Sequence, residues 1–444
     1  MSVVERFARW AEAFRVQPLP PEVAHHAKRA VIDWYAAALP GAVVPPATLL
    51  EKAFEFDLGS RQKSFLVLGK KSASPRVAAL INGAAAHTVE VDDIFRDGIY
   101  HPGAPTIPAA LALGQAEGAP GERFLRAVTV GYEISTRIGA AMGRAHYRYW
   151  HNTGTVGAFG AAAAASEILG LDAPRFAHAL ATAATFSAAL QQAMRGDSMS
   201  KPLHAGRAAE AGVTAALAAR EGVTGSLDVL EGDAGFGRAM SDGPDWEKAL
   251  ATLGGQFNIC RMTFKNHTCC GHTFAAIDGA QALAARMKVA AREIERIRVG
   301  SYRAAKEVSG IEDPRTAAEA RFSLKYVVAT ALTHGSVRLA AFEPGRVNDA
   351  ATRELMRRID VAIDPELDAA FPQQRAARVA IEARDGRREE LLQPTRIGDP
   401  EAPLSDAQLE GKYLELAAPV AGEEKARALL ARLWTLEAAT SLPR

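Results

Sequence analysis

Residues 86–106 have the types and spacing that proton-transfer chemistry requires. This segment reads AHTVEVDDIFRDGIYHPGAPT and contains two histidines and four carboxylates. On a helix, His87, Glu90 and Asp93 follow one another at i, i+3 spacing and so share a face. The glycines and prolines that follow predict that the helix stops and that His101 lies on a loop. An acid, a base and a loop together favour general acid–base catalysis.

Two further polar clusters occur among small residues and helix breakers. In YWHNTGTVG, His151 precedes a helix whose first turn contains Thr155, and the free backbone N–H groups of a helix start can bind an anion. In MSKPLHAGRAA, a proline places Lys201 just before a helix, on which His204 and Arg207 share one face. Both clusters are therefore candidates for binding an anionic substrate.

Two later segments supply additional candidates. KNHTCCGHTFAAID contains Lys265, His267 and His272, and ARFSLKY contains Tyr326. The adjacent cysteines between these histidines suggest zinc, but no C-x-x-C pair is present and neighbouring ligands fit a tetrahedron poorly. We therefore expect no metal site.

Each cluster also has a purely structural interpretation. An acidic turn such as Glu90–Asp93 is common on solvated surfaces, His87 can be a hydrogen-bonded core histidine, and 201–207 can be a basic helix face. We favour function for 86–106 because so many ionisable groups fall between apolar stretches. The sequence contains no Walker A motif, no dinucleotide-binding fingerprint in a βαβ setting and no G-x-S-x-G elbow. We therefore expect chemistry without an organic cofactor.

Composition limits the class of protein. A chain of 444 residues with 48% hydrophobic and 23% charged residues is typical of a soluble globular protein with two domains. A formal charge of +1 and the absence of a basic stripe argue against a nucleic-acid partner. The most apolar run is rich in alanine and glycine and is interrupted by Ser166 and Glu167, which indicates a core helix and no membrane span. Three cysteines and a start without an apolar signal region favour the cytoplasm.

The hydrophobic pattern changes once along the chain. Up to about residue 252, apolar residues recur at helical spacing and alanine is abundant, which predicts an all-helical domain. Beyond it, period-two alternation over 294–301 and over 377–383, before Asp385-Gly386, predicts a strand and a hairpin. We therefore predict a mainly α fold, with a helical domain of residues 1–262 completed by 396–444, and a smaller α+β domain of residues 263–395. The helices expected are 21–38, 74–93, 106–117, 122–143, 155–169, 174–192, 203–220, 275–287, 322–333, 406–416 and 422–436.

The ordered set of motifs resembles the MmgE/PrpD family. The resemblance runs over nearly the whole chain and is carried by HTVEVDD with the following HPG, WHNTGTVGAFGAAAAA, KPLHAGRAAEAGV, LEGDAGF, EARFSLKY and GDPEAPLSD. It implies a large helical domain, closed by the C-terminal tail, and a smaller α+β domain. It also implies a homodimer without an organic cofactor, and a lyase or epimerase that acts on a small polycarboxylate.

The resemblance also implies roles for individual residues. His101, His151 and Lys201 match active-site positions of the family. Glu90 stands where the family usually has its first aspartate, and Asp93 stands at its second. The substrate-binding residues expected from the resemblance and from the clusters above are Thr155, Arg207, Lys265, His272 and Tyr326.

The reaction expected is removal of a proton next to a carboxylate. The negative charge that develops must be met by fixed cations and hydrogen-bond donors. We expect Lys201 and the helix start after His151 to hold substrate carboxylates, with Arg207 assisting. His101 and His151 are the expected acid and base, tuned by the Glu90 and Asp93 carboxylates.

Three outcomes fit these residues. Loss of a β-hydroxyl or amine after deprotonation gives a lyase of the dehydratase type, which we favour. Return of the proton on the opposite face gives an epimerase of an iminodicarboxylate such as iminodisuccinate. Glu90, Ile94 and Phe274 replace an aspartate, a threonine and a histidine of the family pattern, so a non-catalytic carboxylate-binding protein is the third alternative.

Overall fold

The computed structural model describes residues 1–59, 61, 63–194 and 198–444. The chain divides into two compact units. Unit 1 comprises Met1–Thr263 and Ser405–Arg444, and unit 2 comprises Phe264–Leu404. Among the described residues, no helix combines the length and apolarity needed to cross a bilayer.

The boundary between unit 2 and the C-terminal part of unit 1 follows Leu404. The sequence pattern placed this boundary after residue 395. The segment that follows residue 395 is bonded into unit 2. The Ile397 N–H donates to the Asp278 carboxylate at 2.7 Å, and the Phe264 N–H donates to the Gly398 carbonyl at 2.9 Å. These backbone hydrogen bonds keep the segment in the smaller unit until α20 begins.

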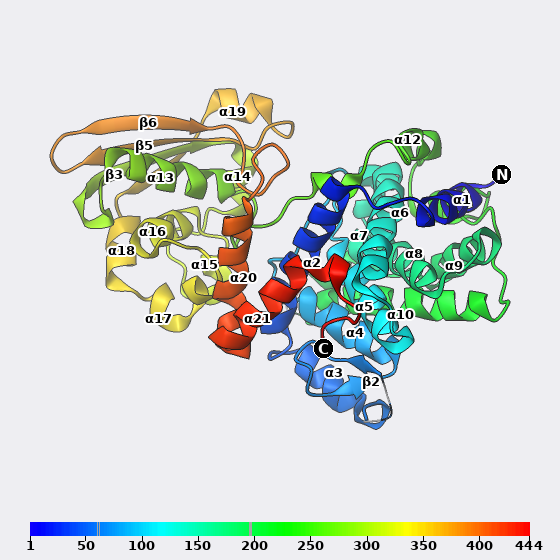
Figure 1. The fold of residues 1–444 in the computed structure, drawn as a ribbon. Helices are drawn as coiled ribbons and strands as arrows, with labels where there is room; N and C mark the ends of the chain where they lie inside the picture. Colours follow the sequence, from blue (N-terminus) through cyan, green and yellow to red (C-terminus); the bar gives the residue numbers. More distant parts are fainter. Residues whose placement is uncertain (60, 62, 195–197) are drawn as a thin grey trace. The chain divides into compact units, whose positions relative to one another are not determined.

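Unit 1 is helical, apart from a short antiparallel ribbon formed by β1 (Ser64–Phe65) and β2 (Ser72–Ala73) (Figure 1). Its core is built largely from alanine and glycine, so helix axes approach closely. Its helices are α1 (Val3–Arg15), α2 (Pro21–Gly41), α3 (Ala47–Ala53), η1 (Glu55–Asp57), α4 (Pro75–Ala86), η2 (Arg96–Gly98), α5 (Gly103–Glu117), α6 (Gly121–Tyr147), α7 (Asn152–Thr155), α8 (Gly157–Leu169), α9 (Ala173–Phe186), η3 (Gln191–Met194), α10 (Ser200–Arg220), α11 (Phe236–Met240), α12 (Trp246–Ala251), η4 (Asn258–Arg261), α20 (Asp406–Ala421), α21 (Glu423–Trp434) and η7 (Leu436–Ala438).

The crossing of α4 and α10 depends on two glycines. A Cβ atom on Gly206 of α10 would lie 2.3 Å from the Leu80 carbonyl oxygen, and one on Gly83 of α4 would lie 2.9 Å from the Gly206 Cα. Only glycine fits at such distances. The close crossing brings the first turns of α10 beside the end of α4, where His87 lies.

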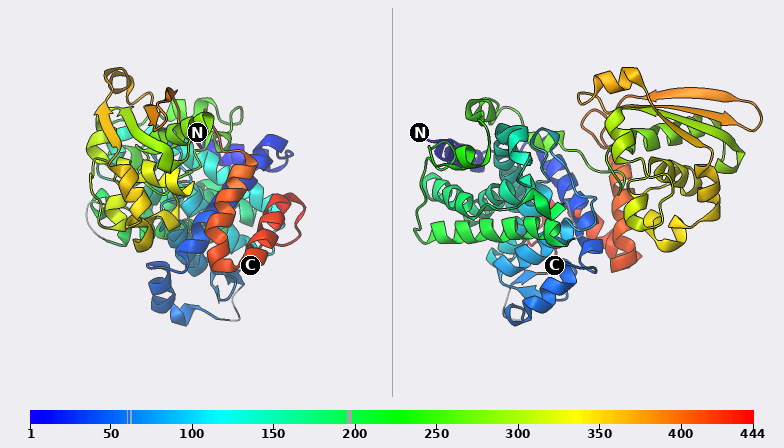
Figure 2. Two further views of the ribbon diagram at one scale, coloured as in Figure 1. Left: turned by 90° about the vertical axis from the view of Figure 1, so that its left-hand side faces the viewer. Right: turned by 180° about the vertical axis from the view of Figure 1, so that it is seen from behind.

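The C-terminal helices of unit 1 stabilise the segment between α4 and α5. Helix α20 lies beside α2 (Figures 1 and 2). Lys412 of α20 is fully buried, and its ammonium group donates to Asp33 of α2 at 2.5 Å and to the Val91 carbonyl at 2.7 Å. A residue from the end of the sequence therefore fixes the backbone of the 88–95 loop.

We expect the Lys412→Met variant to lose about 3 kcal/mol of unfolding free energy, because the buried Asp33 carboxylate loses its ammonium partner. Urea denaturation followed by circular dichroism measures this loss. The control is Lys425→Met, which removes an exposed lysine from α21. Equal stability of the two variants would contradict the prediction.

Unit 2 consists of a four-stranded sheet and short helices. The strand order is β4 (Ile359–Ile363), β3 (Ile294–Ser301), β5 (Ala377–Ala383), β6 (Arg388–Gln393). The β3–β4 pair is parallel and the other two pairs are antiparallel. Helices α13 and α16 pack on the sheet (Figure 1). The helices are α13 (Phe274–Met287), η5 (Ala291–Glu293), α14 (Arg303–Val308), α15 (Ala317–Ala320), α16 (Leu324–His334), η6 (Leu339–Phe342), α17 (Pro344–Val347), α18 (Ala350–Met356) and α19 (Pro365–Ala370).

The predicted combination of a large helical part and a small α+β part is confirmed. The strand over 294–301 and the hairpin through Asp385-Gly386 are also confirmed. One helix prediction is wrong in a way that matters for the site. Helix α4 ends at Ala86 and does not continue to residue 93.

Candidate active site

The loop after α4 turns back toward the helix end. His87 is the C-terminal cap of α4, and the Thr88 hydroxyl donates to the Ala84 carbonyl. Glu90 then adopts a φ of 63°, a left-handed conformation that costs energy for a residue with a Cβ. This reversal returns the chain so that Asp92, five residues after His87, contacts the His87 ring. His87, Glu90 and Asp93 therefore do not share a helix face.

Asp92 joins two imidazoles. Its Oδ2 lies 2.6 Å from Nδ1 of His87 and 3.2 Å from Nδ1 of His101. An ionised carboxylate only accepts hydrogen bonds, so the His87 ring presents an Nδ1–H to it and, when neutral, has its lone pair on Nε2. His101 Nδ1 lies within ion-pair distance of the same oxygen, so the Asp92 carboxylate favours a positive charge on the His101 ring.

A second imidazole pair adjoins the first. His151, the N-terminal cap of α7, has its Nδ1 3.1 Å from Nδ1 of His204 on α10. The His151 ring stacks on that of His87, with centroids 5.4 Å apart. Burial, aided by the neighbouring charges, holds the pKa of His151 well below its usual value and lowers that of His204 to about 4. Both rings are therefore neutral at pH 7, and one donates an Nδ1–H to the other.

Lys201 on α10 forms an ion pair with Glu90. Burial opposes its charge, but the Glu90 carboxylate outweighs this and raises the pKa of Lys201. Lys201 therefore stays cationic beside the histidines, as a carboxylate-binding group must.

Exposure separates the groups that a substrate can reach from those that it cannot. The rings of His87 and His151 are buried, whereas 15% of the His101 side chain and 22% of the Lys201 side chain are exposed. Glu90 is 37% exposed. His101 and His204 are thus the partly exposed imidazoles of the cluster, and His101 has the Asp92 carboxylate beside it.

Two family models match most of the chain. The MmgE/PrpD N-terminal domain matches residues 5–249, and the MmgE/PrpD C-terminal domain matches residues 267–436. The chain belongs to the MmgE/PrpD family. It is 27% identical to cis-aconitate decarboxylase of Homo sapiens over 98% of this chain and 92% of that protein. It is 26% identical to the cis-aconitate decarboxylase-like protein oryM of Aspergillus oryzae over 98% of this chain and 95% of that protein. These matches support a lyase-type enzyme.

Asp93, which matches an acidic position of the MmgE/PrpD motif, has a different environment from the one expected. Its carboxylate accepts hydrogen bonds from the Tyr132 hydroxyl at 2.7 Å and from the Gly103 N–H at 3.0 Å, at the start of α5. Burial raises the pKa of Asp93 to about 8 despite these two bonds. The structure thus gives Asp93 a role in anchoring α5, and it places Asp92 against the two histidines.

The raised pKa of Asp93 predicts a pH effect on stability. The folded protein binds a proton at Asp93 up to about pH 8, whereas the unfolded chain releases it near the ordinary aspartate pKa of 3.8. Its contribution is therefore fully present below pH 3.8 and is lost as the pH rises through 8. We expect the unfolding free energy of wild type, relative to Asp93→Asn, to fall between pH 4 and pH 8. Urea titrations across that range test this, and a constant or rising difference would contradict it.

Thr155 and Arg207, two other expected substrate contacts in unit 1, have protein partners. His146 Nδ1 lies 3.0 Å from the Met240 carbonyl and must donate to it, so His146 Nε2 accepts from the Thr155 hydroxyl at 2.7 Å. Arg207 is largely exposed and pairs with Glu210. The Thr155 hydroxyl also lies 3.4 Å from the carbonyl oxygen of His151. These protein partners favour structural roles for Thr155 and Arg207, and substrate binding by either stays a prediction.

Three expected site residues belong to unit 2. Lys265 is buried near the start of the unit. His272 Nδ1 lies 2.9 Å from the Tyr302 hydroxyl. Tyr326 is fully buried and its hydroxyl donates to the Ala341 carbonyl, so it acts as a core residue and not as an exposed pocket tyrosine.

The histidines flanking the adjacent cysteines also have protein partners. His267 Nε2 lies 2.9 Å from Asp278 Oδ1. The Cys269 sulfur lies 3.2 Å from the Thr273 hydroxyl, and burial raises the pKa of this thiol to about 12. These partners favour structural roles for both residues.

Sequence reasoning missed Asp92 and underrated His87 and His204. The chain reversal at Glu90 could not be predicted, because residues other than glycine uncommonly adopt a left-handed conformation. The ligand-type atoms of His87, Asp92 and His101 lie within 4.8 Å of one another, so this group can hold a metal ion. The contacts of Asp92 with the two rings already account for its geometry.

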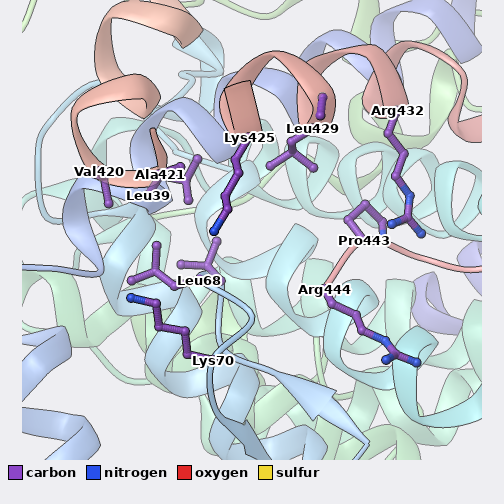
Figure 3. Close-up of a pocket in the computed structure, with 12 residues that line it drawn as sticks. Leu39, Leu68, Lys70, Val420, Ala421, Lys425, Leu429, Arg432, Pro443 and Arg444 are labelled. Atoms are coloured by element: carbon purple, nitrogen blue, oxygen red, sulfur yellow. The ribbon is translucent and has the colours of Figure 1, made fainter. Parts of the chain in front are cut away.

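A separate cavity of unit 1, of about 350 Å³, does not contain this chemistry (Figure 3). Apolar residues and four cationic side chains, of Lys70, Lys425, Arg432 and Arg444, line it. The described lining includes no histidine, aspartate or glutamate. It therefore offers charge for an anion but no side-chain carboxylate or imidazole to act as a base.

Proposed function

We propose that this protein is a lyase of the dehydratase type that needs no organic cofactor. Its substrate is a small di- or tricarboxylate, and it removes a proton from the carbon next to a carboxylate. The observation that carries this proposal is the Asp92 bridge between His87 and His101, with Lys201 beside it. Membership of the MmgE/PrpD family and the cis-aconitate decarboxylase relatives support it.

His101 is the proposed base. Its Nδ1 faces the Asp92 carboxylate at 3.2 Å, so we assign Nε2 as the atom that takes the substrate proton, and the carboxylate stabilises the imidazolium that forms. This positioned proton transfer contributes about 10²–10⁴-fold to the rate. Loss of a hydroxide or an amine from the adjacent carbon, with a proton from His101 or from water, completes the elimination.

Lys201 is the proposed carboxylate ligand. A carbanion next to a carboxylate spreads its charge onto the carboxylate oxygens, where a fixed cation stabilises it. Glu90 neutralises Lys201 in the free protein, so a substrate carboxylate must compete with Glu90 for the ammonium group. The neutral His151–His204 pair leaves one Nε2–H, on the ring that accepts at Nδ1, as a donor that adds no charge.

The test is incubation with a panel of di- and tricarboxylates in deuterated water, followed by proton NMR. We expect one compound to give an unsaturated product with wild type and none with His101→Asn. Solvent deuterium in unreacted substrate without elimination would favour the epimerase instead. Release of CO₂ from the substrate would identify the reaction as a decarboxylation and not a dehydration. Binding of a carboxylate without turnover would favour the non-catalytic binding protein. The expected homodimer and cytoplasmic location stay predictions.

A further inference from the structure

Three side chains of different types meet on unit 1 outside the histidine cluster. Glu22 and His26 lie one turn apart at the start of α2, and Cys260 lies in η4. Their ligand-type atoms, a carboxylate oxygen, an imidazole nitrogen and a thiol sulfur, all lie within 4.8 Å of one another. We propose that these three side chains form a binding site for a divalent transition-metal ion, with Zn²⁺ as the best fit.

The three side chains are close without satisfying one another. Among the described residues, none of them makes a side-chain hydrogen bond or an ion pair. The cluster around Asp92 differs in this respect, because one hydrogen bond and one ion-pair contact account for its geometry. Their proximity is therefore not explained by bonds among the three side chains themselves.

The chemistry of the set suits a soft to borderline dication. A carboxylate, an imidazole and a thiolate are ordinary Zn²⁺ ligands, with bond lengths of about 2.0–2.3 Å, and three protein ligands leave one position for water. Glu22 is exposed, so its side chain can rotate inward to reach these distances. A bound dication would balance the two negative charges of the carboxylate and the thiolate.

Metal binding must displace the proton of the Cys260 thiol, so the affinity for the metal rises with pH.

A metal ion at this site would connect two parts of unit 1 that are far apart in the sequence. Cys260 lies three residues before Thr263, where the first segment of unit 1 ends, and Glu22 and His26 lie at the start of α2. A metal ion would cross-link these two segments. It would stabilise unit 1 by mass action, because the unfolded chain does not hold the three ligands together.

The test is titration of the purified full-length protein with Co²⁺, which takes the same ligands as Zn²⁺ and gives a cobalt–thiolate charge-transfer band. We expect the band to saturate at about one Co²⁺ per chain. Cys260→Ser and His26→Gln should each abolish it, and added Zn²⁺ should remove it by displacement.

Two matched variants serve as controls. His25→Gln removes the neighbouring histidine, which pairs with Asp406, and Cys269→Ser removes a cysteine from unit 2. Both should keep the band. Absence of a band in folded wild type, or an unchanged band in Cys260→Ser, would overturn the proposal. Neither result depends on enzymatic turnover.

Discussion

The His101→Asn variant is expected to lose about 10²–10⁴-fold in kcat, the range that a positioned general base contributes. His101 Nδ1 lies 3.2 Å from the Asp92 carboxylate, so Nε2 is the atom that we expect to receive the proton. Asparagine preserves a polar side chain at this position but has no basic atom. The measurement is steady-state kinetics with the substrate found in the NMR screen.

Two further variants show whether the loss is specific. His178→Asn removes an imidazole that bonds to the Gly225 carbonyl elsewhere in unit 1, and its kcat should stay near the wild-type value. Asp92→Asn keeps His101 but replaces its acceptor by an amide, so kcat should fall while KM changes little. Wild-type turnover in His101→Asn would exclude the proposed base.

Chemical rescue separates loss of the base from loss of the fold. His101 is partly exposed, so free imidazole from solution can enter the space left in a His101→Gly variant. Turnover that rises with imidazole concentration would identify the missing group as a proton acceptor. Turnover unaffected by imidazole, in a variant that still binds substrate, would contradict that role.

The sequence was sufficient where the pattern is local. Strand β3 has the bounds predicted from its alternation, Ile294–Ser301, because Ile297 and Val299 point into the core of unit 2 while Arg296 and Arg298 are exposed. The hairpin turn has Gly386 at a φ of 88°, a conformation that glycine adopts without strain. Periodicity and turn chemistry fix such elements without information from the rest of the chain.

Strand β4 was not predicted, because its cause is non-local. Ile359–Ile363 is short, largely exposed on one face, and lies at the edge of the sheet. It pairs in parallel with β3, some sixty residues earlier in the chain, as in Ile297 with Ile359. A parallel partner across a long connection leaves little signal in the sequence.

The candidate site was predicted in its membership better than in its geometry. Unit 1 contains all four of the predicted residues His101, His151, Lys201 and Glu90. Lys201 pairs with Glu90, His101 contacts Asp92, and the His151 ring stacks on that of His87. Helical spacing chose Asp93 as the acidic partner, but the chain reversal at Glu90 brings Asp92 there instead. Helical periodicity does not hold where the backbone leaves the helix, and the buried Lys412 that holds the Val91 carbonyl comes from the other end of the sequence.

The Lys201→Met variant is expected to lose about 10³-fold in kcat/KM, because it removes a cation from a partly buried site where charge develops. Methionine keeps much of the volume of the side chain and removes only the charge. The Glu90 carboxylate, now without its partner, would also repel an anionic substrate. Lys201→Arg keeps the positive charge and should retain more activity than Lys201→Met.

A double variant distinguishes substrate binding from simple neutralisation of Glu90. If Lys201 served only to balance Glu90, the combination Lys201→Met with Glu90→Gln would regain wild-type kcat/KM, because neither charge would remain. We expect it to recover only a part, since the substrate carboxylate would still lack its cation. Arg207→Gln is the matched control: it removes an exposed cation of the same helix that pairs with Glu210, and such surface pairs contribute little. Full recovery of kcat/KM in the double variant, or an equal loss of kcat/KM in Arg207→Gln, would contradict a specific role of Lys201 in binding the substrate carboxylate.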